Sequence, residues 1–226
     1  MKSHLSMRSG NPALNSKIFT SSIEEGSEKM TIGGTVNKTV LSLLLLMITA
    51  SYTFVNESYG LMFFGFIGGF IMALITIFKK TWAPYTVPGY AILEGLALGG
   101  ISQIFEQKYA GIASQAIFLT FGILAALLLA YKTKLIKPTE NFKLGVFAAT
   151  GGIFIMYLIS WIIGLFSSGT SILSPDNTSL FSIGISLFVV VIASLNLVLD
   201  FDFIEEGSER GAPKYMEWYG AFGLLI

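Results

Sequence analysis

The chain has no cysteine, a single histidine and few charged residues. Without thiols it can form neither a disulfide nor a thiolate metal site, and a cysteine nucleophile is excluded. Charged residues make up 12% of the chain, against roughly 25% in an ordinary soluble domain. Basic and acidic residues balance at 14 each, so the chain lacks the excess of positive charge that nucleic-acid binding requires.

Apolar residues dominate instead. They make up 53% of the chain, and the mean hydropathy is +0.70. Six apolar runs approach or exceed the roughly 20 residues with which a helix crosses a membrane. These runs are 39–55, 60–78, 87–105, 112–131, 144–166 and 180–203. The sequence therefore predicts an all-α polytopic membrane protein, with a polar N-terminal segment at 1–38 and a helical membrane domain at 39–226.

A seventh helix is expected to begin near Lys214, but only about a dozen residues follow before Ile226. At a rise of about 1.5 Å per residue, that length is too short to cross a bilayer. We therefore expect an incomplete seventh helix over 214–226, which either stops halfway across the membrane or is cut short in this chain.

The basic residues predict an orientation. Of the 14 lysine and arginine residues, only Lys108 falls in a loop on the side of the predicted membrane domain opposite to the N-terminus. Short loops rich in lysine and arginine stay in the cytoplasm, which predicts a cytoplasmic N-terminus. A polar stretch of nearly forty residues precedes the first apolar run, so no cleavable signal is evident. We expect a multi-pass membrane protein.

Small residues recur at helical spacing within the apolar runs, where they allow membrane helices to approach closely. They are Gly65, Gly68 and Gly69 in the second run, Gly95 and Gly99 in the third, and the pairs Gly145 with Ala149 and Ala148 with Gly152 in the fifth. We interpret them as packing positions within one bundle. The alternative is a role in homodimer formation.

Asp200 lies at the end of an otherwise apolar run. An acid in such a place is usually functional, and it must find a partner, water or a proton. Counting back by threes and fours from Asp200 gives a stripe rich in small and polar groups, which we expect to face the bundle interior. The stripe consists of Asn196, Ala193, Val189, Ser186 and Ser182. Asp200 is thus a candidate proton or cation site, with calcium as a candidate ligand.

Asp200 also has a simpler interpretation as a helix-end carboxylate that reaches cytoplasmic water or pairs with Lys214 or Arg210. Asp202 lies roughly 200° around the helix from Asp200, so we expect it at the membrane interface, as a second candidate site. Glu205 and Glu206 come next along the chain. We interpret them either as acids at the mouth of a pore or as part of a solvated helix end.

Glu94 is a second acid inside an apolar run. No basic residue in its own helix neutralises it, so it would hold a proton near neutral pH or bind a cation. The alternative is a protonated side chain that bonds to a neighbouring helix. Since the third run starts on the cytoplasmic side, Glu94 is expected at a depth similar to that of Asp200.

Four strings in the chain resemble a bacterial branch of the Bax inhibitor-1/YccA family. They are RSGNPAL at 8–14, EGLALGGIS at 94–102, ASLNLVLDFDFIEEG at 193–207 and GAPKYMEWYGAF at 211–222. The resemblance implies a seven-helix bundle in which six helices surround a central seventh. It also implies a pH-sensitive calcium leak, governed by a carboxylate on helix six that pairs with an aspartate on helix seven.

Asp200 followed by Ile204 matches the family's helix-six acid. The partner position on helix seven falls near Leu224 or Leu225, which are apolar. The second apolar run also contains no lysine or arginine, so no basic partner is apparent in it. That Glu94 or Asp202 replaces the missing aspartate of helix seven is a hypothesis.

Three functions are therefore open. The first is a cation or calcium leak in which Asp200, Glu94 and the acids 205–206 supply oxygen ligands. The second is a non-conducting regulator of the membrane stress response or of a membrane-bound protease, with the stretch 23–26 facing the partner. The third is an intramembrane enzyme or transporter, for which the sequence offers little, since its only histidine is His4 and no Gly-x-Ser-x-Gly motif occurs.

We expect a protein that is not an enzyme and needs no cofactor, with calcium as the transported ion. Its expected partners are the lipid bilayer, calcium or protons, and a membrane protease, but no nucleic acid.

Overall fold

The computed structural model describes residues 28–133, 135–136, 138–166 and 179–226. Within these ranges the chain forms seven α-helices, one short 3-10 helix and a single isolated β-bridge. The elements are α2 (Ile32–Asn56), α3 (Tyr59–Phe78), η1 (Lys80–Trp82), α4 (Ala83–Lys108), α5 (Ile112–Lys132), α6 (Glu140–Phe166), α7 (Leu180–Glu209) and α8 (Met216–Leu225). The predicted all-α fold is confirmed.

Five of the described helices are long and apolar enough to cross a membrane: α2, α3, α5, α6 and α7. The protein is therefore a multi-pass membrane protein. The remaining long helix, α4, has 26 residues, ten of them buried. A helix that is enclosed by its neighbours needs less apolar side chain than one that faces lipid, which fits the more polar composition of α4. Its assignment as a span stays a prediction.

The helices alternate in direction along one long axis. Their ends are fixed by local signals: Thr31 caps α2 by accepting a hydrogen bond from the Gly34 N–H at 3.0 Å, and Glu57 ends it in the left-handed region at φ 50°. Gly111 and Gly211 adopt φ of 86° and 69° in the turns before α5 and after α7, a conformation that glycine adopts without a steric cost.

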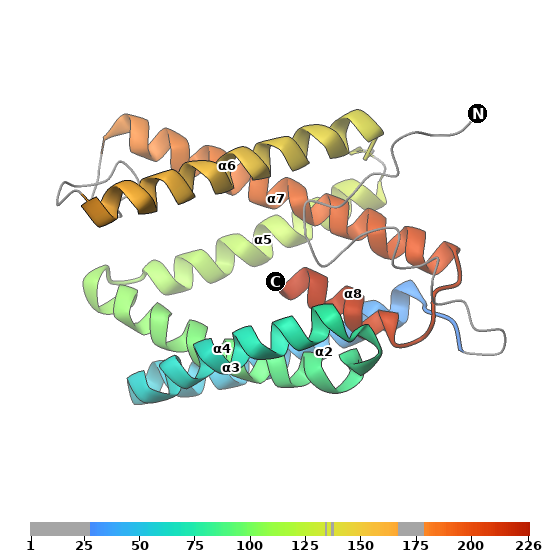
Figure 1. Ribbon diagram of the computed structural model, residues 1–226, viewed down its shortest axis with the longest axis horizontal. Coiled ribbons are helices and arrows are strands. Elements are labelled where there is room, and N and C mark those ends of the chain that lie inside the picture. The colour runs from blue at the N-terminus through green and yellow to red at the C-terminus, as the bar shows by residue number, and fades with distance from the viewer. Residues whose placement is uncertain (1–27, 134, 137, 167–178) are drawn as a thin grey trace.

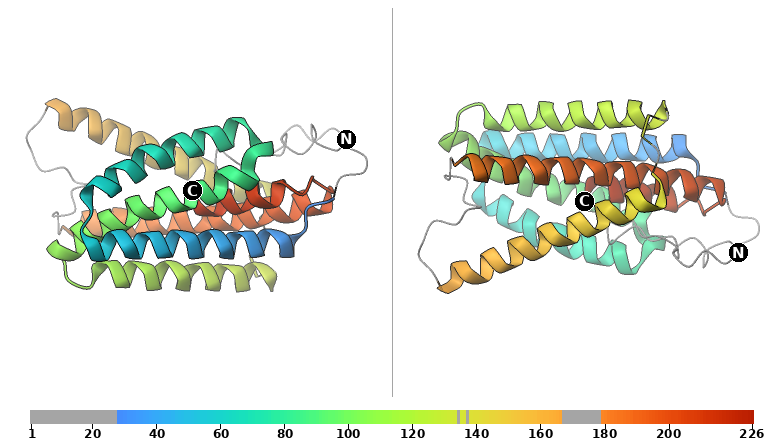
Figure 2. Two further views of the ribbon diagram at one scale, coloured as in Figure 1. Left: turned by 90° about the horizontal axis from the view of Figure 1, so that it is seen from below. Right: turned by 90° about the horizontal axis from the view of Figure 1, so that it is seen from above.

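The bundle has a tightly packed part and a looser part. Helices α2, α3 and α4 lie together on one side, and α6 and α7 lie on the other, with α8 between α7 and the α2–α4 pair (Figure 1). Helix α5 contacts α4 and α7, while α6 contacts α7 and runs at an angle to it (Figure 2). The contacts of α8 with α2, α4 and α7 agree with the interior seventh helix that the sequence implied.

Glycines bring the helices of the tight part together. A Cβ placed on Gly65 of α3 would lie 2.5 Å from the Leu93 carbonyl oxygen of α4, and Cβ atoms on Gly95 and Gly99 would overlap α2 at Thr49 and Ala50. These three positions therefore confirm the predicted close packing, because no larger residue fits without moving a backbone.

The same prediction is wrong for α6. No described atom lies within 4 Å of a Cβ placed on Gly145 or Gly152, and both residues are exposed. The reason is the course of α6, which runs at an angle to α7 and leaves a hollow between the two helices, lined by Gly152 among others.

The N-terminal string at 8–14, the acidic stretch 23–26 and the connector at 167–178 lie outside the described residues.

Candidate functional site

Helices α2, α4, α6 and α8 begin at the same end of the bundle, where α3, α5 and α7 finish. We call it the basic end, because Lys38, Lys79, Lys80, Lys143 and Lys214 are found there. The described acids that carry functional predictions, apart from Glu94, lie in the last turns of α7, which finishes here. The candidate site is therefore built from the last turns of α7, the first turns of α8 and the side chains facing them.

Asp200 is buried, with 5% of its surface exposed. It lies on the face of α7 against which α8 packs, since Ile204, one turn further on, approaches Gly220 of α8. The simpler interpretation of Asp200 was an ion pair with Arg210 or Lys214. In the described structure Arg210 pairs with Glu206, and Lys214 pairs with Glu28.

The polar stripe before Asp200 is only partly enclosed. Ser182 is buried and Asn196 half-buried, whereas Ser186 and Ala193 are exposed, so the predicted inward direction is wrong for the latter two. The physical reason is that α8, with ten residues, covers only the last turns of α7. Asn196 donates to Thr150 Oγ1 and to the Ile192 carbonyl, both at 2.9 Å. Its Oδ1 is buried and has no hydrogen-bond partner in the described structure.

Asp202 forms an ion pair with Lys143 of α6, at 2.6 Å from carboxylate oxygen to Nζ. The Glu140 carboxylate lies 3.7 Å from the same ammonium. Asp202 is half-buried, and its position at the membrane interface stays a prediction. Since its negative charge is matched by Lys143, Asp202 ties α6 to α7 rather than standing as an open cation ligand.

The two predicted pore-mouth acids lie in the last turns of α7. Glu206 pairs with Arg210 one turn later on the same helix, and both Glu205 and Glu206 are half-buried.

Glu94 is half-buried on α4 and lies against α3, where a Cβ placed on Gly69 would be 3.1 Å from its Oε2. It thus borders the α3–α4 contact, whereas Asp200 borders the contact between α7 and α8. In the described part of the chain, no three acidic or histidine side chains gather closely enough to hold a metal ion. Calcium coordination by Asp200 with Glu94 stays a prediction.

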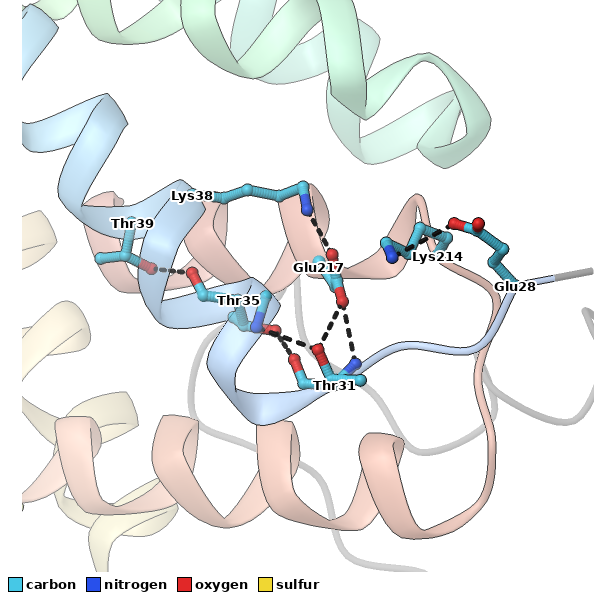
Figure 3. Close-up of polar contacts among 8 residues, drawn as sticks. Glu28, Thr31, Thr35, Lys38, Thr39, Lys214 and Glu217 are labelled. Carbon is cyan, nitrogen blue, oxygen red and sulfur yellow. Dashed lines mark hydrogen bonds and ion pairs between the residues drawn. The ribbon is translucent and has the colours of Figure 1, made fainter.

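The most enclosed carboxylate of the described chain is one that the sequence analysis did not select. Glu217, in the first turn of α8, is 0% exposed. Its Oε1 accepts hydrogen bonds from the Thr31 N–H at 2.9 Å and from Thr31 Oγ1 at 2.8 Å. Its Oε2 pairs with the Lys38 ammonium (Figure 3). We call Thr31, Gly34, Lys38 and Glu217 the Glu217 cluster.

Each member of the Glu217 cluster has a physical reason to be there. Gly34 has no side chain, and a Cβ at this position would fall on the Glu217 carboxylate. Lys38 reaches across from the second turn of α2, and its ammonium also lies 5.7 Å from the centre of the Trp218 ring. Two neutral donors and one cation thus stabilise a carboxylate that is withdrawn from water.

The polar segment before α2 strengthens this junction. The Met30 N–H donates to the Ala212 carbonyl at 2.6 Å, and the Lys214 N–H donates to the Glu28 carbonyl at 2.8 Å. Together with the bridge between Lys29 and Pro213, these bonds make residues 28–31 a strap across the turn between α7 and α8.

Comparison with known proteins gives one result. A family model described as "Bax inhibitor 1 like" matches residues 11–226, which is nearly the whole chain. The chain belongs to the Bax inhibitor-1-like family. Comparison with curated proteins and with solved structures finds no match. Membership of the bacterial YccA branch stays a prediction.

In this Bax inhibitor-1-like protein, the expected position of a second acid on the seventh helix falls near Leu224 and Leu225, which are apolar. The buried acid of α8 is Glu217, and its basic partner, Lys38, comes from α2 rather than from the second predicted span. A usable signal was present: Glu217 stands between apolar and aromatic residues at the start of an apolar helix, where a free carboxylate is costly. Lys38 was assigned to the polar segment at 1–38, whereas α2 already begins at Ile32.

Proposed function

We propose that this protein is a cation leak of a bacterial cytoplasmic membrane, with calcium among its ions and Asp200 as the proton and cation site. On this proposal it is not an enzyme and needs no cofactor. The observation that carries the proposal is the burial of Asp200, at 5% exposed, on the face of α7 that α8 covers. A carboxylate kept in such a place in a membrane protein is a proton or ion site by default.

Asn196 supports the same proposal. It precedes Asp200 by four residues and therefore lies on the same face of α7. Its buried Oδ1 lacks a hydrogen-bond partner in the described structure, and an amide oxygen beside a carboxylate is a ligand pair that calcium accepts. The bias of the lysine and arginine residues favours a cytoplasmic basic end, so Asp200 would meet the cytoplasm when α8 moves.

The test is calcium entry into dye-loaded liposomes between about pH 6 and pH 8, for the full chain and for Asp200→Asn. We expect entry that changes with pH in the unchanged protein and a flat profile in Asp200→Asn. Asp202→Asn is the matched control: it removes a carboxylate from the same helix, but one already paired with Lys143, so the profile should keep its shape. Calcium entry no greater than in empty liposomes would refute the leak.

One observation favours a second candidate, a non-conducting regulator of a membrane-bound protease or of the membrane stress response. The strap at 28–31 joins the N-terminal side of the chain to the turn before α8 and to Glu217. A partner that binds the N-terminal segment would therefore act directly on α8. Absence of calcium entry in the liposome experiment would make this candidate the better explanation.

A further inference from the structure

The Glu217 cluster joins two helices that are far apart in the sequence, and its two charged partners are buried to different degrees. Glu217 is 0% exposed, whereas the Lys38 side chain keeps 19% of its surface exposed. The lysine can therefore leave the pair for water, while the carboxylate stays enclosed and keeps its two bonds to Thr31. An ion pair with one replaceable partner is suited to a switch, because breaking it does not leave the acid wholly unsatisfied.

Helix α8 packs against the face of α7 that carries Asp200. Beside Gly220, α8 approaches both neighbours closely: a Cβ there would lie 3.1 Å from Thr35 Cγ2 of α2 and 3.3 Å from Ile204 Cγ1 of α7. Ile204 is one turn beyond Asp200 on the same face. If α8 moves away from α7, the face of Asp200 is uncovered.

Aromatic contacts also hold α8 in place, but they do not join it to α2 by charge. Phe222 packs edge-on against Tyr90 of α4, with ring centres 5.1 Å apart, and the Lys80 ammonium lies 5.8 Å from the Tyr219 ring centre. Lys38 and Glu217 provide the ion pair between α2 and α8 in the described structure. Removal of one partner from a buried ion pair is strongly destabilising, so loss of this attraction weakens the α2–α8 contact.

We propose that the Lys38–Glu217 ion pair is a latch that holds α8 between α2 and α7, and that release of this latch opens the cation path past Asp200. The proposal rests on the proposed leak. It assigns to Lys38 and Glu217 the regulation of the site that Asp200 forms.

The test uses the absence of native cysteine. Ala221 of α8 is 0% exposed, so Ala221→Cys in the full chain gives a single thiol whose reaction with a water-soluble maleimide reports the release of α8. In this background, Lys38→Met and Glu217→Gln should both react about tenfold faster or more. Lys38→Arg keeps the charge and should react like the parent. Lys214→Met, which breaks the more exposed pair with Glu28, is the matched control and should also leave the rate unchanged.

Calcium entry is measured on the same proteins. Lys38→Met and Glu217→Gln should increase entry severalfold, and Asp200→Asn added to either should abolish the increase. Glu217→Gln retains an oxygen that can accept from Thr31, so it keeps the proposal testable if Lys38→Met does not fold, as judged by gel filtration in detergent.

Unchanged labelling in a folded Glu217→Gln protein would overturn the latch, whatever the calcium result. If the parent protein conducts, faster labelling of a variant with unaltered calcium entry would show that the latch does not control the cation path past Asp200. Faster labelling without entry in any protein, the parent included, would support the latch on α8 and overturn the proposed leak.

Discussion

Glu217 and Asp200 are both carboxylates removed from water, and the described structure shows in full how one of them is stabilised. Isolated burial of a carboxylate is far too costly for a stable fold. Glu217 has a cation and two hydrogen-bond donors around it, and removal of one partner from such a buried pair typically costs about 3–5 kcal/mol. The space for this arrangement depends on one residue, Gly34.

We predict that Gly34→Ala destabilises the protein by about 1–3 kcal/mol, the usual cost of an added methyl group in a full site. The new Cβ would fall on the Glu217 carboxylate and force it away from Lys38 and Thr31. Thermal unfolding in detergent, followed by circular dichroism, measures the effect.

The neighbouring glycine provides the control. A Cβ on Gly33 has no described atom within 4 Å, and alanine is the better helix former by about 0.8–1 kcal/mol. Gly33→Ala should therefore leave the protein as stable as before or more so. Equal destabilisation by both substitutions would show that the start of α2, rather than the Glu217 carboxylate, is sensitive.

At the scale of elements, the turn between α4 and α5 shows how a side chain sets the start of a helix. Glu106 accepts hydrogen bonds from the Gly111 N–H at 2.5 Å and from the Ala113 N–H at 2.9 Å. These amides belong to the first turn of α5, which has no other way to satisfy them within the helix. The hydrogen bonds from Ala113 and Gly111 hold the pKa of Glu106 below its usual value.

This pKa shift predicts a pH dependence of stability. A carboxyl whose pKa is lower in the folded than in the unfolded chain stabilises the fold above the unfolded pKa of about 4.3. That contribution is lost as the pH falls through the lower, folded pKa. The melting temperature of Glu106→Gln should therefore lie below that of the unchanged protein by a constant amount above about pH 5, and the gap should narrow toward about pH 3.

Glu57→Gln, an exposed position at the same end of the bundle, should show no such narrowing. If the difference in melting temperature between Glu106→Gln and the unchanged protein stays constant down to acid pH, the charge of Glu106 does not stabilise α5.

The course of individual helices could be predicted from apolar runs, but their exact ends could not. The run at 60–78 is nearly the same as α3 (Tyr59–Phe78), because apolar residues and glycine make up almost the whole helix. Helix α7 continues six residues past the predicted end at 203, and Glu206 in this extension pairs with Arg210 one turn later. Ion pairs can continue a helix beyond the end of its apolar run, and hydropathy does not show them.

The candidate site was predictable only in part for the same reason. Asp200 stands out because it interrupts an apolar run on its own helix. Glu217 depends on Lys38, which lies 179 residues earlier, and no local pattern reveals a pairing over that distance. A single sequence shows which residues need a partner, not which residue provides it.

At the scale of the whole molecule, burial is distributed unevenly. Helix α4 has ten buried residues, and α8 has seven of its ten buried. In contrast, α5 and α6 present most of their side chains outward. Regions with few enclosed contacts open at lower free energy than the core does, so the two parts of the bundle should differ in local stability.

We predict that hydrogen exchange in detergent is slowest in α4 and α8 and fastest, among the long helices, in α6. Mass spectrometry of peptic peptides would measure this order. Since α5 is similarly exposed but contacts both α4 and α7, it serves as the internal comparison and should exchange more slowly than α6. Protection of α6 equal to that of α4 would contradict a division into a tight and a loose part.

The Lys38–Glu217 contact also has a consequence for how the chain is made. Synthesis runs from the N-terminus, so Lys38 and the strap at 28–31 emerge long before Glu217, their partner 179 or more residues later. During that interval five further helices are produced, and Lys38 must stay at a water-exposed surface without its counter-ion. Helix α8 therefore closes this end of the bundle: its arrival brings the counter-ion of Lys38, and until then the newly made bundle remains open at this end.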